Sequence, residues 1–170
     1  MFWIKTLRSI LSILQSEISP RQIAGGFAMG AVIGLVPSPF LKILFFLLVL
    51  VLKINIGAAL LSVPFFTLAG LATDLPAHWI GHTVLVRAGF LSGLWTFLYN
   101  IPVVPYTGFN NTVVMGNFIL SLILFPPVYF GAIRFVLYYR ARLRQKVEKW
   151  KIMKWFKLAN VFNIYGRYAE

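Results

Sequence analysis

No charged residue occurs between Arg87 and Arg134, and the only charges between Lys53 and Arg134 are Asp74 and Arg87. Soluble domains carry about 25% charged residues, spread over their surface. In this chain 12% of residues are charged and 59% are hydrophobic. A helix needs about 20 mostly apolar residues to cross a bilayer, so the uncharged stretch has room for several crossings. The sequence therefore predicts an all-α integral membrane protein.

Prolines and aromatic-rich stretches divide the apolar part into segments. We expect a membrane domain over 19–133, built from a helical hairpin (20–53), a helix broken at Pro64 (54–73), an interfacial segment (75–110) and a crossing helix (112–133). The hairpin turns at Pro37 and Pro39, because the residue before a proline disfavours the helical conformation. Its second arm is too short to cross alone, which leaves open whether the hairpin spans or re-enters. Trp and Tyr in 75–110 indicate a position at the membrane surface.

Three glycines follow one another at intervals of four in the first helix of the hairpin: Gly26, Gly30 and Gly34. Glycines in this register leave a groove without side chains, into which another helix backbone fits closely. Each glycine lowers helix propensity, so a packing contact is a better explanation than chance. These residues are the predicted helix-packing site.

The two ends of the chain predict amphipathic helices outside the membrane domain. The segment 1–18 places apolar residues at helical spacing opposite polar ones, as in a helix lying in the interface; a frayed polar start is the alternative. The tail 134–170 is strongly basic. Its predicted headgroup-binding residues are Arg134, Arg140, Arg142, Arg144, Lys146, Lys149, Lys151, Lys154 and Lys157. Such a tail either binds anionic lipid or is only a solvated stop signal that orients the protein.

The chain has 16 Lys and Arg against 4 Asp and Glu, a net charge of +12. Strong positive charge is typical of proteins that contact nucleic acid or an anionic membrane, and the apolar composition favours the membrane. Basic residues in loops favour the cytoplasmic side. Because both ends are basic, we expect a multi-pass protein of the bacterial inner membrane with both termini in the cytoplasm.

Asp74, His78 and His82 are spaced so that one helix would place all three on one face. They are either a metal or proton-relay site, or Asp74 caps a helix that starts near Leu75 and the histidines lie at headgroup depth. We favour the cap, and we expect no metal and no cofactor. The chain has no cysteine and few acids, so it lacks the residues for common catalytic arrangements, and we expect no enzyme.

The run from Ser19 to Gly30, the stretch from Ile33 to Pro37 and the tripeptide Lys53-Ile54-Asn55 resemble the bacterial family catalogued as domain of unknown function 2062. The stretches Trp95–Asn100 and Phe109–Val114 resemble a narrower subgroup of it. The chain departs from the pattern of many members at Ser38, where they carry Gly, and at Val63, where they carry Asn before the proline.

The resemblance implies an inner-membrane protein without established activity. Related domains occur fused to glycosyltransferases, and the subgroup tends to be encoded beside a larger membrane-anchored envelope protein. We therefore expect a non-enzymatic protein that packs against a membrane-protein partner or a second copy and assists envelope lipid or glycolipid handling. The alternative is a small transporter or channel subunit, because neighbouring helices broken by Pro and Gly are typical of transport sites.

Overall fold

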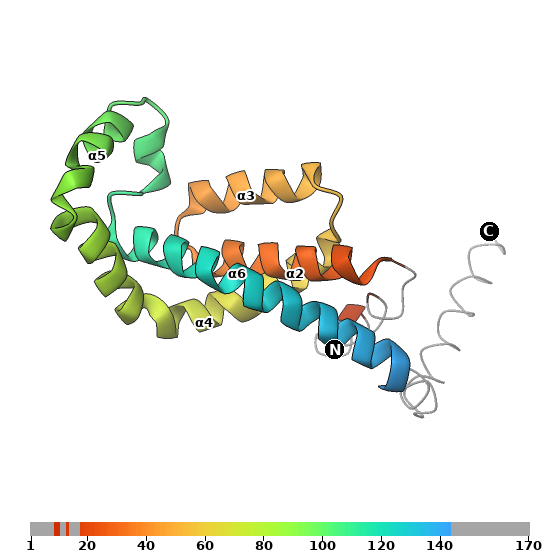
Figure 1. Ribbon diagram of the computed structural model, residues 1–170. Coiled ribbons are helices and arrows are strands. Elements are labelled where there is room, and N and C mark those ends of the chain that lie inside the picture. The colour runs from red at the N-terminus through yellow and green to blue at the C-terminus, as the bar shows by residue number, and fades with distance from the viewer. Residues whose placement is uncertain (1–8, 11–12, 14–17, 144–170) are drawn as a thin grey trace.

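The computed structural model describes residues 9, 10, 13 and 18–143, and within them every regular element is helical, with no strand. Figure 1 shows the α-helices: α2, α3, α6 and the first part of α4 run roughly parallel or antiparallel along one axis, and α4 then curves toward α5. Their bounds are α2 (Pro20–Leu35), α3 (Pro39–Val51), α4 (Ile56–His82), α5 (Ser92–Tyr99) and α6 (Thr112–Tyr138). Single turns of other helix types are η1 (Thr83–Arg87), η2 (Gly89–Leu91), η3 (Val104–Thr107) and η4 (Tyr139–Leu143).

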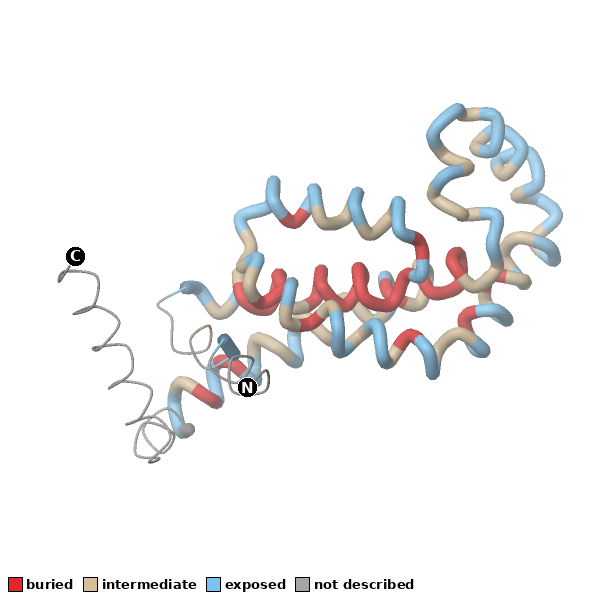
Figure 2. The backbone as a smooth tube through the Cα atoms, turned by 180° about the vertical axis from the view of Figure 1, so that it is seen from behind, coloured by how far each residue is buried: buried red, intermediate tan, exposed pale blue. Residues whose placement is uncertain are grey.

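Helix α2 is the centre of the molecule. It begins at Pro20, as the sequence predicts, because proline is well suited to the first helical turn. Ser19 contributes its backbone carbonyl to the first turn and makes no side-chain cap. From Ile23 to Leu35 every residue except Phe27 is buried, which Figure 2 shows as an almost continuous buried tube between the other helices.

Helix α3 runs back along α2 after a turn at Pro37, where the sequence predicts one. The Ser38 hydroxyl accepts a hydrogen bond from the backbone N–H of Leu41, at 3.4 Å, and so caps α3. Phe45, Phe46 and Val49 pack toward α2, while the opposite side of α3 is exposed and apolar. Both faces of α3 are therefore hydrophobic, the one packed on α2 and the one that is exposed.

Helix α4 is longer than predicted. Asn55 caps it, with Oδ1 accepting from the Ala58 N–H at 2.7 Å. The prediction that this helix ends at Thr73 is wrong: it continues to His82, and η1 extends it to Arg87. The helix passes through Pro64 and Pro76, and both prolines lie on its exposed side.

Helix α6 begins where predicted and ends later. Asn111 caps it by accepting from the N–H groups of Val113 and Val114. It continues beyond Ile133 to Tyr138 and then into η4, so the predicted boundary between membrane domain and basic tail is not a break in the helix. The rest of the tail, and most of the predicted helix over 1–18, lie outside the described residues.

Residues 88–111 form a cap across one end of the bundle, which we call the α5 end (Figure 1). Two hydrogen bonds attach this cap to the bundle: the Ser38 hydroxyl donates to the Thr107 carbonyl at 2.6 Å, and the Trp95 Nε1–H donates to the Val84 carbonyl at 3.3 Å. The predicted interfacial segment 75–110 is thus divided, because 75–87 continues the long helix and only the remainder forms the cap.

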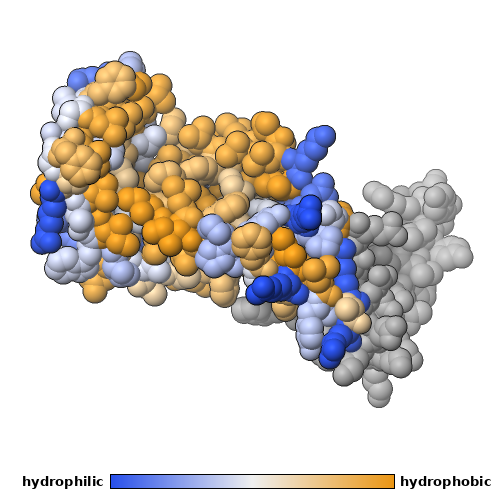
Figure 3. Space-filling view, viewed as in Figure 1, coloured by the Kyte–Doolittle hydropathy of each residue, from blue (hydrophilic) through white to orange (hydrophobic). Residues whose placement is uncertain are grey.

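Two helical stretches are long and apolar enough to cross a membrane by length and composition, Ile56–Arg87 and Thr112–Arg142. Hydrophobic side chains cover much of the surface over α3, α5 and the middle of α6, and hydrophilic ones gather toward the end where α6 finishes (Figure 3). A soluble bundle rarely exposes so large a contiguous apolar surface.

Candidate functional site

Gly26, Gly30 and Gly34 all face α4. A β-carbon on Gly30 would overlap the Ser62 Oγ and the Ala59 carbonyl oxygen, and one on Gly34 would lie 2.7 Å from the Val63 carbonyl oxygen. The two backbones are therefore in direct contact, as in membrane helix pairs with small residues at every fourth position. The helix seated on this face is α4 of the same chain.

The three predicted helix-breaking prolines differ in effect. Pro37 and Pro39 flank the turn between α2 and α3, whereas Pro64 is exposed within a continuous α4. The prediction of a break at Pro64 is wrong, since the helix continues on both sides of it. The transporter alternative rested on two broken segments, and without the second break no specific observation favours it.

Asp74, His78 and His82 share one side of α4, as their spacing predicts. The prediction that Asp74 caps a helix starting near Leu75 is wrong, because α4 is continuous there. Asp74 instead accepts a hydrogen bond on Oδ1 from the side-chain Nδ2 of Asn117 in α6, at 2.9 Å. His78 Nδ1 lies 2.7 Å from the Thr112 hydroxyl, and the His78 and His82 rings are 6.1 Å apart.

Asn117 is the residue that sequence analysis missed. Its side chain is fully buried between α4 and α6. The Thr73 hydroxyl lies 2.9 Å from Asn117 Oδ1 and 3.1 Å from the Gly70 carbonyl, so its single proton serves one of them at a time. The amide thus donates to a carboxylate and accepts from a hydroxyl, which fixes its orientation. We call Thr73, Asp74 and Asn117 the polar triad.

The polar triad lies beside a very close helix crossing. A β-carbon on Gly81 would overlap the Thr112 carbonyl, and one on Gly116 would overlap the Ala77 carbonyl. The small residues bring α4 and α6 together, and this closeness allows the short side chains of the triad to meet. The sequence signal was available: Asn117 is the one Asn or Gln in the 27 residues of α6.

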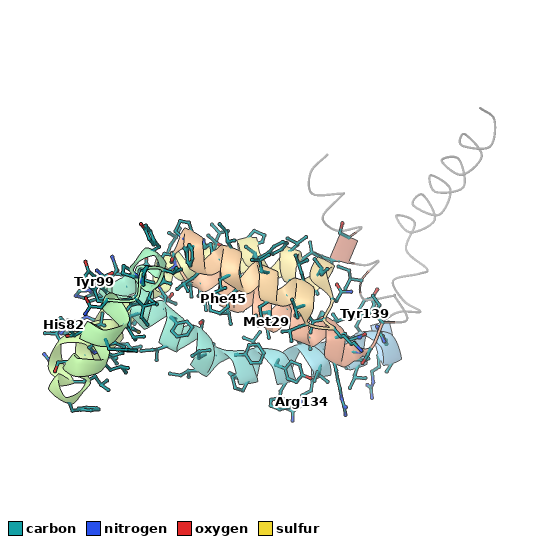
Figure 4. The ribbon with its side chains drawn as sticks, turned by 90° about the horizontal axis from the view of Figure 1, so that it is seen from above. Met29, Phe45, His82, Tyr99, Arg134 and Tyr139 are labelled. Carbon is teal, nitrogen blue, oxygen red and sulfur yellow. The ribbon has the colours of Figure 1, made fainter. Side chains whose placement is uncertain are left out.

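The predicted headgroup residues that the structure describes lie at the end opposite to α5. Arg134 and Arg142 are exposed, and the Arg140 guanidinium donates to the Ile18 carbonyl at 2.7 Å. Arg21 and Lys53 join them there, because α2 begins and the α3–α4 connection lies at the same end. We call these five residues the basic end; Figure 4 shows Arg134 and Tyr139 far from His82 and Tyr99. Outside the described residues are Arg144, Lys146, Lys149, Lys151, Lys154 and Lys157.

An apolar groove of about 550 Å³ opens between α2, α4 and α6 near the basic end. Its lining comes from Ile10, Ile13, Ile23 and Phe27, from α4 between positions 58 and 66, and from α6 between positions 128 and 136. Sequence analysis did not predict it, because a groove depends on how three helices separate rather than on any local pattern.

The buried polar side chains of the described residues find their hydrogen-bond partners within the protein. Within residues 18–143 and the three described positions before them, no three His, Cys, Asp or Glu side chains are arranged to hold a metal ion, and every buried side-chain N or O atom has a hydrogen-bond partner. The triad and the His78–Thr112 pair therefore act as contacts between α4 and α6.

One comparison with known proteins gives a match. The family described as an uncharacterized protein conserved in bacteria (DUF2062) matches residues 5–145, which include every helix from α2 to α6. No curated protein and no solved structure matches the chain. Because the match covers most of the sequence, the chain belongs to the DUF2062 family.

Proposed function

We propose that the protein is a multi-pass protein of the bacterial inner membrane that binds anionic lipid headgroups at its basic end. Its role is binding rather than catalysis, and it serves envelope lipid or glycolipid handling together with a membrane-protein partner or a second copy. The observation that carries this proposal is the separation of charge. Five cations lie at the basic end. The α5 end has two, Lys42 and Arg87, and Asp74, the only acid between positions 18 and 143, lies toward it.

The helix lengths between these two levels support insertion. From Ile56 to Asp74 along α4 is about 27 Å, and from Asn117 to Arg134 along α6 is about 26 Å, at 1.5 Å per residue. The hydrocarbon core of a bilayer is about 30 Å thick. The basic end and the polar triad are thus spaced as the two boundaries of one hydrocarbon layer, with the residue 88–111 cap in the interface beyond.

The hairpin fits the same layer. Helix α2 has 16 residues, or about 24 Å, and the turn at Pro37 lies beside the cap through the Ser38–Thr107 hydrogen bond. We therefore infer that the hairpin reaches the far boundary rather than stopping halfway, which gives four crossings. The 13 residues of α3 cover about 20 Å, and residues 52–55 complete its return to the basic end.

The outward-facing side chains are those that lipid favours. Ile43 and Val51 of α3 are 63% and 81% exposed, and Leu68 and Leu71 of α4 are 70% and 72% exposed. In water, this much contiguous apolar surface would favour aggregation. In lipid, exposing this apolar surface carries no free-energy penalty. Each cation near an anionic leaflet contributes about 1 kcal/mol to binding. The positive-inside rule then places the basic end in the cytoplasm.

Lipid selection tests the role of the basic end. The full chain, purified in mild detergent, is offered equal amounts of phosphatidylglycerol and phosphatidylcholine, and native mass spectrometry counts the bound lipids. We expect phosphatidylglycerol to be preferred, and Arg134→Gln with Arg142→Gln to lower that preference about tenfold or more, from about 1 kcal/mol per cation. The matched control is Arg87→Gln, an exposed cation at the α5 end. Equal preference in all three proteins would refute the proposal.

Topology is tested separately with single cysteines, which are unique because the chain has none. In intact cells whose outer membrane is permeabilised, a membrane-impermeant maleimide should label Gly93→Cys at the α5 end and leave Ala141→Cys at the basic end unlabelled. Both positions are exposed, so the difference reports the side of the membrane. The reverse pattern, or labelling of both, contradicts the proposed orientation.

A further inference from the structure

The apolar groove has no polar side chain in its lining. Its walls are Ile, Phe, Leu, Val, Ala and one glycine, Gly131. A ligand enclosed by such walls gains contact area but finds no side-chain hydrogen-bond donor or acceptor, so the enclosed part must be hydrocarbon. The volume, about 550 Å³, lies in the ordinary range of ligand sites, about 300–1,000 Å³.

The groove opens sideways between α4 and α6. Phe65 of α4 and Phe135 of α6 are 64% and 55% exposed at its rim, while Ile23 at its floor is buried. No residue of α3 lines the groove, whose two walls beside the α2 floor come from α4 and α6. A ligand can therefore enter from the surrounding lipid without crossing the helix bundle.

The groove occupies the depth of one leaflet. Its lining on α4 runs from position 58 to 66 and on α6 from 128 to 136, each about 12 Å of helix. One leaflet contributes half of the hydrocarbon core, or about 15 Å. The groove begins at the basic end, because three of its lining residues, Ile23, Ala58 and Val136, form one buried cluster there with Tyr139.

Two cations lie near the end of the groove that faces the basic end. Arg21 is in the first turn of α2, two residues before Ile23 of the floor. Arg140 follows Val136 of the wall by one turn of helix and donates to the Ile18 carbonyl at 2.7 Å. No described residue at this end is acidic. The charge at the end of the groove is thus complementary to an anionic group attached to the hydrocarbon.

We propose that the apolar groove holds one acyl chain of an anionic phospholipid from the cytoplasmic leaflet, with its phosphate at the basic end. This inference rests on the proposed function and adds a defined site to it: a single lipid bound at a fixed place, rather than a general attraction to the membrane surface. The occupant is a lipid rather than a second copy, because the charges at the groove's end would repel an identical basic end.

The experiment fills the groove without disturbing the fold. A β-carbon at Gly131 meets no atom within 4 Å, so Gly131→Phe places its ring in open groove space. The matched control is Gly93→Phe in α5, where a β-carbon also meets nothing within 4 Å. The full chain in phosphatidylcholine vesicles is exposed to trace phosphatidylglycerol with a photoreactive group in one acyl chain, and the labelled peptides are sequenced.

We expect labelling within 58–66 and 128–136. Gly131→Phe should reduce it about tenfold, which is the affinity lost when about two methylene groups of the acyl chain are no longer buried. Gly93→Phe should leave it unchanged. Equal labelling of the Gly131→Phe protein, or labelling spread evenly over all lipid-facing helices, overturns the proposal. A disulfide between two copies of a Gly131→Cys protein would also overturn it, by showing that a second copy covers the groove.

A headgroup comparison separates this inference from the proposed function. If photoreactive phosphatidylcholine labels the groove as strongly as phosphatidylglycerol, an acyl-chain site exists but the basic end does not select its lipid, and the proposal of an anionic ligand is wrong. If headgroup preference persists in native mass spectrometry while Gly131→Phe has no effect on labelling, the basic end selects lipid and the groove is not its site.

Discussion

Helix α4 contacts α2 and α6 through two interfaces of different chemistry. The α2–α4 interface is steric: glycines of α2 rest on backbone atoms of α4, and the buried Ser62 hydroxyl donates to the Ala59 carbonyl of its own helix at 3.0 Å. The α4–α6 interface has the same close backbone contact at Gly81 and Gly116, but it adds the polar triad, whose hydrogen bonds join one helix to the other.

The two interfaces therefore determine two different quantities: how close two helices lie, and how they are aligned along the bundle axis. Small residues determine how closely two helices approach, yet a glycine face offers similar contacts after a shift along the axis. A hydrogen bond between two particular side chains is lost by such a shift, and an unpaired polar group in an apolar environment is costly. The α4–α6 interface therefore fixes the depth of both helices, whereas the α2–α4 interface fixes the separation.

The largest effect should come from Gly30→Leu. Because a β-carbon alone would overlap the backbone of Ala59, α2 cannot stay seated on α4, and we expect a loss of more than about 3 kcal/mol in the free energy of unfolding. The midpoint of thermal unfolding in mild detergent measures it. Gly131→Leu, with open space around it, is the control. A Gly30→Leu protein as stable as this control would show that the steric interface is wrongly described.

Next in size is Asn117→Leu, which leaves the Asp74 carboxyl without its amide partner. We expect a loss of about 1–3 kcal/mol in the free energy of unfolding, measured by titration of mixed micelles with a denaturing detergent. Adding Asp74→Leu should recover part of that loss, because two apolar side chains then meet. If the double variant loses the sum of the two single losses, the pair is not coupled and does not fix the register.

Several features were predictable because their causes are local. Pro20, Pro37 and Pro39 set the limits of α2 and α3 through backbone geometry, and Asn55 caps α4 through a bond spanning three residues. The glycine spacing in α2 also identified a packing face. Its partner was not predictable, since a face of this kind accepts any helix that the chain or the membrane supplies.

The errors arose where a tertiary contact outweighed a local preference. Pro64 and Asp74 each suggested an interruption, yet α4 passes through both: Pro64 has its ring on the exposed side, and Asp74 has Asn117 as a partner 43 residues later. The apolar groove has no sequence pattern, because it is the space left where α4 and α6 diverge over α2. Spacing could place Asp74 on a face, but only packing could show what it meets.

A smaller effect should follow from Thr73→Val, which keeps the shape of the side chain and removes the hydroxyl from the polar triad. Because Asn117 Oδ1 then loses its donor, we expect a loss of about 1 kcal/mol in the free energy of unfolding in mixed micelles. Thr67→Val, an exposed threonine of the same helix, is the control and should change it little. Equal losses at both positions would show that the bond to Asn117 adds nothing to the α4–α6 contact.

The smallest effect should come from Ser62→Ala, although Ser62 is as deeply buried as Asn117. Its hydroxyl returns to its own helix, so removing it breaks no bond between α2 and α4, and the Ala59 carbonyl keeps its place in the helix. We expect a change within about 0.5 kcal/mol by the same titration. A loss as large as that of Thr73→Val would mean that Ser62 joins the two helices after all, and the contrast between a steric and a polar interface of α4 would disappear.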